Sequence, residues 1–160
     1  MTLVERAVEH ALGARLLDVA AVSTDDIEIE RLVERLPVEV IRRRCGPDGP
    51  MVDVLRDALE QVGGDWDAVV TVQPTSPLRT SEDIDGCIRH WVDNPSFAVV
   101  SVDEMGNRNG AVYISPVSLI RAGEVFRGDG EDLGYEMPDA RSLDINLPVD
   151  LAEARIVLGA

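Results

Sequence analysis

The 160-residue sequence contains no lysine, so its 15 basic residues are all arginines, set against 30 aspartates and glutamates. The resulting formal charge of −15 argues against broad nucleic-acid binding, because contacts to phosphates need a basic surface. The sequence also has no run of about twenty apolar residues that could cross a membrane, and no apolar signal segment at its start. We therefore expect a soluble, cytoplasmic protein with no nucleic-acid or membrane partner.

Cysteine and histidine are equally scarce, with two of each. Cys45 and Cys87 lie far apart without metal-ligand spacing, which argues against a zinc site. His10 and His90 lie in helix-like stretches without an acidic or thiol partner pattern, so we interpret them as ordinary helix residues. The length suits a single domain, residues 1–160.

Short apolar, β-branched segments alternate with helix-like segments along the chain. Strands are predicted at 18–23, 38–41, 68–72, 97–102 and 109–114, with a weak strand near Tyr135 and a short alternating stretch at 142–146. Helices are predicted at 2–13, 24–36, 51–62, 116–122 and 148–158, and from Thr80 onward. This alternation predicts an α/β sandwich with a parallel sheet and right-handed crossovers.

The segment 68–80 carries the most information about function. Its apolar first half predicts a strand buried on both faces, and Pro74 and Pro77 must end that strand because proline cannot donate to a sheet ladder. Thr80 then predicts a helix N-cap with Asp83 as its capping-box partner. The loop between them lies at the carboxyl end of a central strand, where open α/β sheets bind ligands, although a polar turn without chemistry is an alternative. Its polar side chains are Gln73, Thr75, Ser76 and Arg79.

The string Gln-Pro-Thr-Ser-Pro-Leu-Arg-Thr at 73–80 resembles the acylneuraminate cytidylyltransferases, the CMP-sialic acid synthetase family. Three other segments, 22–25, 109–114 and 135–154, also resemble motifs of this family, and all occur in the family's order. The resemblance implies a Rossmann-like three-layer α/β/α sandwich of the nucleotide-diphospho-sugar transferase type. It also implies the transfer of CMP from CTP to a nonulosonic, sialic-acid-like sugar acid, with release of pyrophosphate and with Mg²⁺ as cofactor.

The resemblance also assigns roles to individual residues. It implies Asp144 as the catalytic metal-binding carboxylate, with Asn146 where the family has a second metal-binding aspartate. Two residues apart on a predicted strand, both side chains would leave the same face, although a plain strand end followed by a helix cap is the alternative. For Arg79 a solvent-facing helix residue is the alternative, and for Tyr113 a core aromatic. The implied substrate-binding residues are Gln73, Thr75, Ser76, Arg79, Arg108, Asn109 and Tyr113.

Three departures from the family pattern bear on these expectations. The sequence begins at the turn into the family's first helix, after its first strand and its phosphate-binding loop, and the segment between 102 and 109 is short. Asn146 replaces a carboxylate by a neutral amide, which is a weaker Mg²⁺ ligand. We therefore expect an enzyme whose missing strand and loop are supplied by another chain or by an upstream start, and whose open sheet edge is covered in a homodimer or by a partner chain. A non-catalytic relative that binds a ligand or a partner is the alternative.

Overall fold

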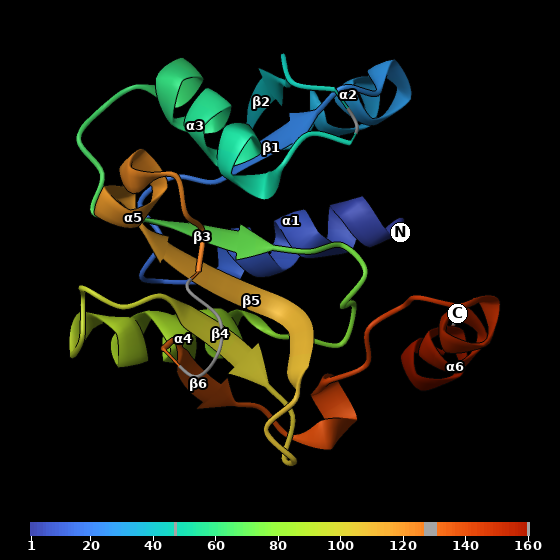
Figure 1. Ribbon diagram of the computed structural model, residues 1–160. Helices are drawn as coiled ribbons and strands as arrows, with labels where there is room; N and C mark the ends of the chain where they lie inside the picture. Colours follow the sequence, from blue (N-terminus) through green and yellow to red (C-terminus); the bar gives the residue numbers. More distant parts are fainter. Residues whose placement is uncertain (47, 127–130, 160) are drawn as a thin grey trace.

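The computed structural model describes residues 1–46, 48–126 and 131–159. Its helices and strands alternate over most of the chain, as the sequence predicts (Figure 1). The helices are α1 (Leu3–Gly13), α2 (Ile27–Val33), α3 (Met51–Val62), α4 (Ser81–Val92), α5 (Val117–Ala122), α6 (Pro148–Leu158) and the 3₁₀ helix η1 (Asp139–Arg141). The strands are β1 (Ala21–Thr24), β2 (Glu39–Arg42), β3 (Ala68–Val72), β4 (Val99–Val102), β5 (Arg108–Pro116) and β6 (Leu133–Glu136).

The strands form two hydrogen-bonded groups, and one strand runs against the others. β1 and β2 pair in parallel, and the second group has the order β3-β5-β4-β6. β5 is antiparallel to both β3 and β4, whereas β4 and β6 are parallel. The prediction of an all-parallel sheet was therefore wrong for β5, which follows β4 after a tight turn at 103–107.

Helices cover both faces of the strands, which gives the expected three layers. α1 and α4 contact each other on one face, and α3 and α5 contact each other on the other face. Hydrogen bonds fix the first pair, because the Asp85 carboxylate accepts from the backbone N–H groups of Arg15 (2.9 Å) and Leu16 (3.0 Å). The core between α4 and the sheet is built from fully buried aliphatic side chains, among them Ile84, Val99, Val112 and Ile114.

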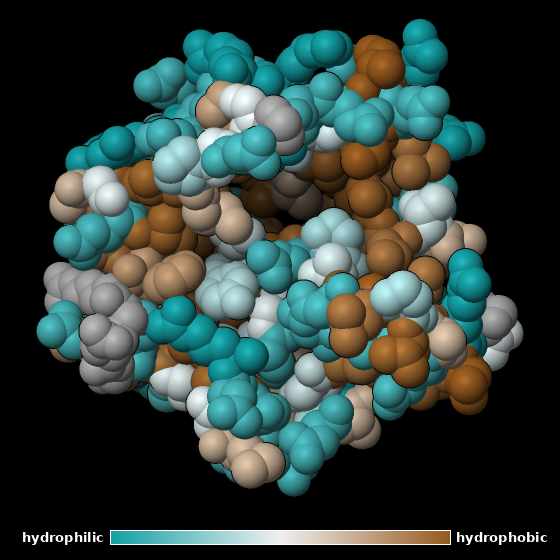
Figure 2. All heavy atoms as spheres, turned by 45° about the vertical axis from the view of Figure 1, so that its right-hand side comes forward, coloured by the Kyte–Doolittle hydropathy of each residue, from teal (hydrophilic) through white to brown (hydrophobic). Residues whose placement is uncertain are grey.

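A cavity of about 670 Å³ separates β1 from β3, and we call it the β1–β3 slot. It is lined by residues 21 and 23 of β1, by all of β3, by one face of α3 and by Ile88 and Trp91 of α4. Figure 2 shows a hollow near the middle of the molecule with hydrophobic side chains inside it. The sheet is therefore interrupted within the three-layer architecture.

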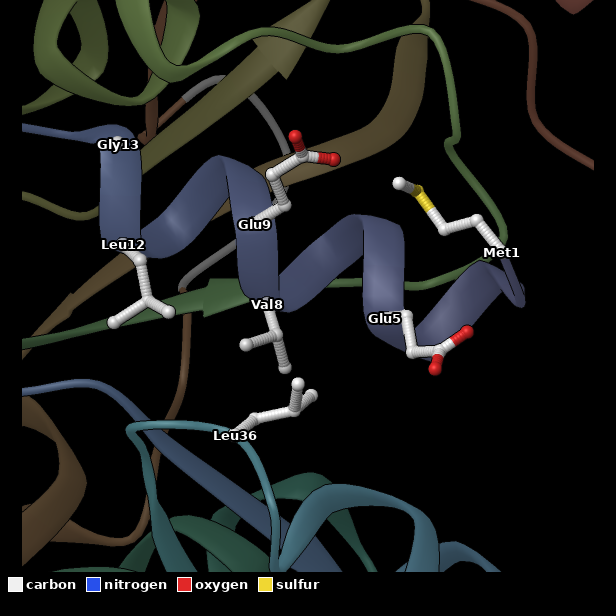
Figure 3. A pocket seen from close by; sticks show the side chains of 7 residues that line it. All are labelled: Met1, Glu5, Val8, Glu9, Leu12, Gly13 and Leu36. Carbon is white, nitrogen blue, oxygen red and sulfur yellow. The ribbon is translucent and has the colours of Figure 1, made fainter.

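A second, more open pocket of about 530 Å³ lies along α1 (Figure 3). Val8 points from α1 toward Leu36, which follows α2, and Leu12 lies further along the same side of the helix. This pocket marks the boundary between α1 and the segment that connects α2 to β2. Within the described residues, no helix has the length and apolar character needed to span a bilayer.

Candidate functional site

Two of the predicted site residues converge on a glycine at the start of β5. A β-carbon placed on Gly110 would lie 3.1 Å from Asp144 Oδ2 and 3.1 Å from Gln73 Oε1. Both oxygens lie within 3.1 Å of one point, so they are at most twice that, 6.2 Å, apart. Gly110 has φ +72°, a left-handed conformation that disfavours any residue with a side chain. Its missing side chain leaves the space that a carboxylate and an amide now share.

The loop after β3 is held by side chains that the sequence suggested as substrate contacts. Arg79 is 1% exposed, and its Nη1 donates to the backbone oxygens of Gln73 (2.7 Å) and Ala111 (3.0 Å). Burial lowers the pKa of Arg79 to about 10, although the nearby Asp83 carboxylate acts in the opposite direction. Ser76 is fully buried, and its hydroxyl donates to the backbone oxygen of Asn109 (3.4 Å). Arg79 and Ser76 therefore join the loop to β5 and position Gln73.

Asn109 has a similar structural role. Its Oδ1 accepts hydrogen bonds from the Ser101 hydroxyl (2.6 Å) and from the Ala111 N–H (3.2 Å). Its Nδ2 donates to the Ser142 hydroxyl (2.9 Å) and contacts the Met137 sulfur at 3.6 Å. These bonds use both ends of the amide, so Asn109 connects β4 and β5 to the segment that carries Asp144.

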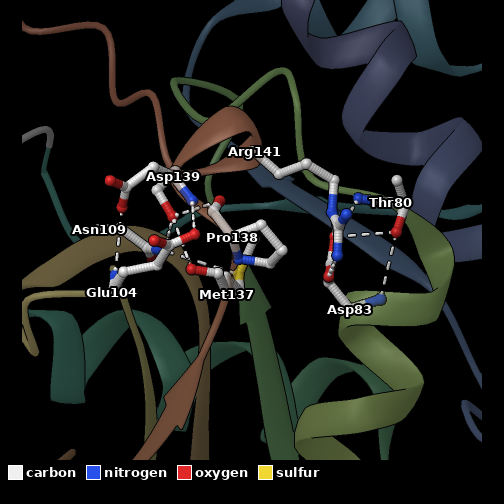
Figure 4. A network of polar contacts seen from close by, with 9 residues as sticks. Thr80, Asp83, Glu104, Asn109, Met137, Pro138, Asp139 and Arg141 are labelled. Carbon is white, nitrogen blue, oxygen red and sulfur yellow. Dashed lines mark hydrogen bonds and ion pairs between the residues drawn. The ribbon is translucent and has the colours of Figure 1, made fainter.

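An ion pair between the buried Asp83 carboxylate and the partly exposed Arg141 fixes the same segment to α4 (Figure 4). Asp83 caps α4 through Thr80 and receives two hydrogen bonds from Arg141, at 2.9 Å from Nε and 2.8 Å from Nη2. Burial alone would raise the pKa of Asp83, but the bonds from Arg141 and Thr80 outweigh it and hold that pKa below its usual value. Paired carboxylate and guanidinium groups of this geometry are strong and directional. The pair therefore sets where the chain leaves η1 on its way to Asp144.

The segment that carries Asp144 and Asn146 is not a strand. Residues 142–146 are irregular, which corrects the prediction of a strand there. The segment instead attaches to the loop after β3, since Ile145 N donates to Thr75 O at 2.8 Å. The two side chains nevertheless meet, because Asn146 Nδ2 donates to Asp144 Oδ2 at 3.0 Å. Pairing with the loop, and not with a neighbouring strand, places Asp144 beside Gln73.

Aromatic and cationic side chains from β5 lie close to this position. Tyr113 stacks on Phe126 with ring centroids 5.7 Å apart, and the Arg108 guanidinium lies 4.6 Å from the centroid of the same ring. Arg108 also pairs with Asp132 at 3.0 Å. Burial raises the pKa of Tyr113, the Asp144 charge raises it further, and Arg108 opposes the shift. Tyr113 therefore lies near Asp144, and Arg108 adjoins Tyr113 through the Phe126 ring that both contact.

The predicted residues therefore divide into two groups. Gln73, Thr75, Asp144 and Asn146 are brought together at the carboxyl end of β3, with Tyr113 near them. Ser76, Arg79 and Asn109 lie buried beneath them. Sequence reasoning assigned no site role to Gly110, Phe126 or the Arg141–Asp83 pair. The Asn-Gly dipeptide at 109–110 could have pointed to Gly110, and the capping box at Thr80 could have pointed to Asp83.

No protein-family model matches the chain. Solved structures match it closely in shape and weakly in sequence. A CMP:2-keto-3-deoxy-manno-octonic acid synthetase complexed with CTP has a TM-score of 0.78 and 12% identity, covering 98% of this chain and 87% of that one. The fold is that of the nucleotidyltransferases.

Two further structures support the nucleotidyltransferase fold. A 4-diphosphocytidyl-2C-methyl-D-erythritol synthase from Anaerococcus prevotii has a TM-score of 0.69 and 10% identity, with coverage of 99% and 89% of the two chains. A cytidylyltransferase from Leptospira borgpetersenii has a TM-score of 0.68 and 16% identity, with coverage of 94% and 73%. The similar structures include synthetases that act on different substrates, so the sugar acid inferred from the sequence stays a prediction.

Proposed function

We propose that this protein is a CTP-dependent cytidylyltransferase that transfers CMP to a hydroxyl of a sugar acid of the sialic-acid type and releases pyrophosphate. One observation carries the proposal: the Asp144 carboxylate and the Gln73 amide flank Gly110 at the carboxyl end of β3. This is the end of an α/β sheet at which ligands bind. The choice of CTP as the nucleotide is supported by the similar synthetase structure, which is complexed with CTP.

The donors around Asp144 suit magnesium. Mg²⁺ takes hard oxygen ligands, keeps several waters and is commonly held by one or two carboxylates together with substrate phosphates. The described residues contain no cluster of three or more His, Cys, Asp or Glu side chains that could hold a metal. In this proposal Asp144 is the protein's carboxylate ligand, with the Gln73 amide oxygen beside it at Gly110. Asn146 donates its amide N–H to Asp144 Oδ2 and so orients that carboxylate. The bound ion would neutralise charge on the phosphates during transfer.

The rest of the reaction asks the protein for position more than for covalent chemistry, because phosphoryl-type transfers depend on alignment and electrostatic stabilisation. In this proposal Gln73 and Thr75 orient the sugar, and the bonds by which Arg79 and Ser76 fix their loop support that role. The Arg108 guanidinium lies over the Phe126 ring, and from there its positive charge can attract the carboxylate of the sugar. The Tyr113 hydroxyl, protonated at neutral pH, can donate a hydrogen bond to the same substrate.

The direct test measures pyrophosphate release from CTP and Mg²⁺ with two acceptors, a nine-carbon sialic acid and the eight-carbon 2-keto-3-deoxy-manno-octonic acid. We expect turnover with the nine-carbon acid, and we expect Asp144→Asn to lower kcat by about 100-fold or more, the usual effect of losing one electrostatic contact to the transition state. Glu153→Gln, an exposed acid on α6, is the matched control and should keep full activity. Absence of pyrophosphate with both acceptors, or an Asp144→Asn variant as active as the control, would overturn the proposal.

A further inference from the structure

The guanidinium of Arg79 lies directly behind the candidate site. Its Nη1 donates to the backbone oxygens of Gln73 (2.7 Å) and Ala111 (3.0 Å). Gln73 supplies the amide at the site, and Ala111 follows Gly110, which the Gln73 and Asp144 side chains flank. Because Arg79 is 1% exposed, a ligand at the site would meet these walls and not the guanidinium itself. Any effect of Arg79 on a ligand must therefore act through space.

Arg79 carries a buried positive charge that no carboxylate binds. Its Nε and Nη2 are buried and have no hydrogen-bond partner in the part of the chain that the structure describes. Its Nη1 bonds to two backbone oxygens, so within the described residues Arg79 donates to no carboxylate. The nearby Asp83 carboxylate already accepts from Arg141 and from Thr80 (Figure 4). Two guanidinium groups thus share the charge of one carboxylate, and a buried charge without its own partner needs an explanation.

The position of Arg79 makes its charge effective at the site. Burial lowers the pKa of Arg79 to about 10, with Asp83 acting in the opposite direction, so the side chain keeps its proton at neutral pH. Salt screens a buried charge weakly, and the surrounding protein weakens its field less than water would. The chain as a whole has a formal charge of −15, which repels anions. Arg79 therefore gives the site a local charge opposite in sign to that of the chain.

His10 on α1 lies close enough to sense this charge. Its backbone oxygen accepts from the Ser81 hydroxyl at 2.7 Å, two residues after Arg79, and its Nδ1 is buried without a partner among the described residues. The charged groups that act on the imidazole are Arg79, Arg6, Glu9 and Asp83. Burial lowers the pKa of His10 most, the two cations lower it further, and the two carboxylates oppose them. The imidazole is thus a built-in probe of the field around Arg79.

We propose that Arg79 is an electrostatic positioning residue, whose buried and unpaired charge attracts the anionic phosphates of the nucleotide to the site without touching them. The inference rests on the proposed function, because it concerns the same site. It adds a role to the hydrogen bonds of Arg79, which by themselves hold the loop and do not select for anions. A unit charge on the order of 10 Å away, at an effective dielectric constant of about 20, changes the affinity for an anion by roughly tenfold.

The first test measures binding of CTP with Mg²⁺ by titration calorimetry. Arg79→Gln removes the charge and keeps an amide N–H₂ group that can donate to the same backbone oxygens, and it should weaken CTP binding by roughly tenfold. Arg89→Gln is the matched control, because Arg89 is exposed on α4 and the same charge is removed there from the surface. It should leave the affinity unchanged.

The second test needs no ligand. The titration of His10 is followed by NMR in the wild type and in Arg79→Gln, with the two histidine signals distinguished by His90→Gln. Removal of a nearby positive charge should raise the pKa of His10, because that charge disfavours the protonated imidazole. Loss of hydrogen bonds that only hold the loop predicts no such rise.

A third variant leaves Arg79 and its bonds in place, which keeps the proposal testable if Arg79→Gln does not fold. His10→Glu brings a carboxylate into the field of Arg79 and should weaken CTP binding at about pH 8, where the introduced carboxyl is ionised. His10→Gln is its neutral control and should bind CTP like the wild type.

Several outcomes would overturn the proposal. They are undiminished CTP binding in Arg79→Gln, an equal loss in Arg89→Gln, an unchanged His10 titration in Arg79→Gln, and equal CTP binding by His10→Glu and His10→Gln. A wild-type protein that binds no CTP refutes the proposed function. An unchanged His10 titration refutes this inference even in an active enzyme, so the two failures are separate results.

Discussion

Replacing Gly110 by alanine tests whether the convergence of Asp144 and Gln73 matters for function. The change has two costs. An alanine held at φ +72° carries about 1–2 kcal/mol of left-handed backbone strain. Its methyl group would also lie 3.1 Å from Asp144 Oδ2 and from Gln73 Oε1, closer than ordinary van der Waals contact, so both side chains must move by a few tenths of an ångström.

Gly106 provides a matched control. It has φ +83° in the turn between β4 and β5, and a β-carbon there would meet nothing within 4 Å. Gly106→Ala therefore carries the backbone strain without the displacement. For a chain of this length, the shared strain should lower Tm by about 2–8 °C in both variants, measured by a thermal melt.

Activity should separate the two variants. A displacement of about 1 Å can cost on the order of 100-fold in rate, so a shift of a few tenths should lower kcat/KM for cytidylyl transfer by roughly tenfold in Gly110→Ala. Gly106→Ala should keep wild-type kcat/KM once it is assayed well below its Tm. Equal activity loss in the two variants, or undiminished activity in Gly110→Ala, would refute the reasoning.

Three further predictions follow from buried charged and polar groups. Arg141→Met should lower the free energy of unfolding by about 2–3 kcal/mol in urea denaturation, less than the 3–5 kcal/mol typical of a broken buried pair because the Arg141 side chain is 38% exposed. The folded-state pKa of Asp83 lies below its ordinary value of 3.8, so the stability that Asp83 contributes should be complete above about pH 4. That contribution should be lost as the pH falls through the folded-state pKa. Thermal melts in acid in which Asp83→Asn loses as much stability below pH 4 as the wild type would contradict this prediction. Burial raises the pKa of the Cys87 thiol, so an Ellman assay on the native protein should modify Cys45 alone, and rapid modification of both thiols would contradict the buried position of Cys87.

Local signals in the sequence predicted several elements correctly. The capping box at Thr80 places the start of α4, and the helices predicted at 2–13 and 51–62 match α1 and α3 to within one residue. The two prolines after β3 end that strand where predicted. These features depend on backbone constraints that act within a few residues, so a single sequence is enough to read them.

Features that depend on pairing between distant segments were harder to predict. Apolar periodicity carries no strand direction, so the antiparallel course of β5 was missed, although the link at 103–107 is too short for a parallel crossover. The alternation at 142–146 suggested a strand, but the segment bonds to the loop after β3 instead. The site residues were found by resemblance. Their division into partly exposed side chains and buried supports such as Arg79 depends on the packing of β5 against the loop.

The most direct test of the central claim, that Asp144 holds Mg²⁺ at a CTP site, is a thermal melt with and without CTP and Mg²⁺. A ligand at about one hundred times Kd adds about 2.7 kcal/mol to the native state, which for a chain of this length raises Tm by about 5–10 °C. The account predicts such a rise in the wild-type protein and its loss in Asp144→Ala. An unchanged Tm in the wild type, or an equal rise in Asp144→Ala, would contradict it.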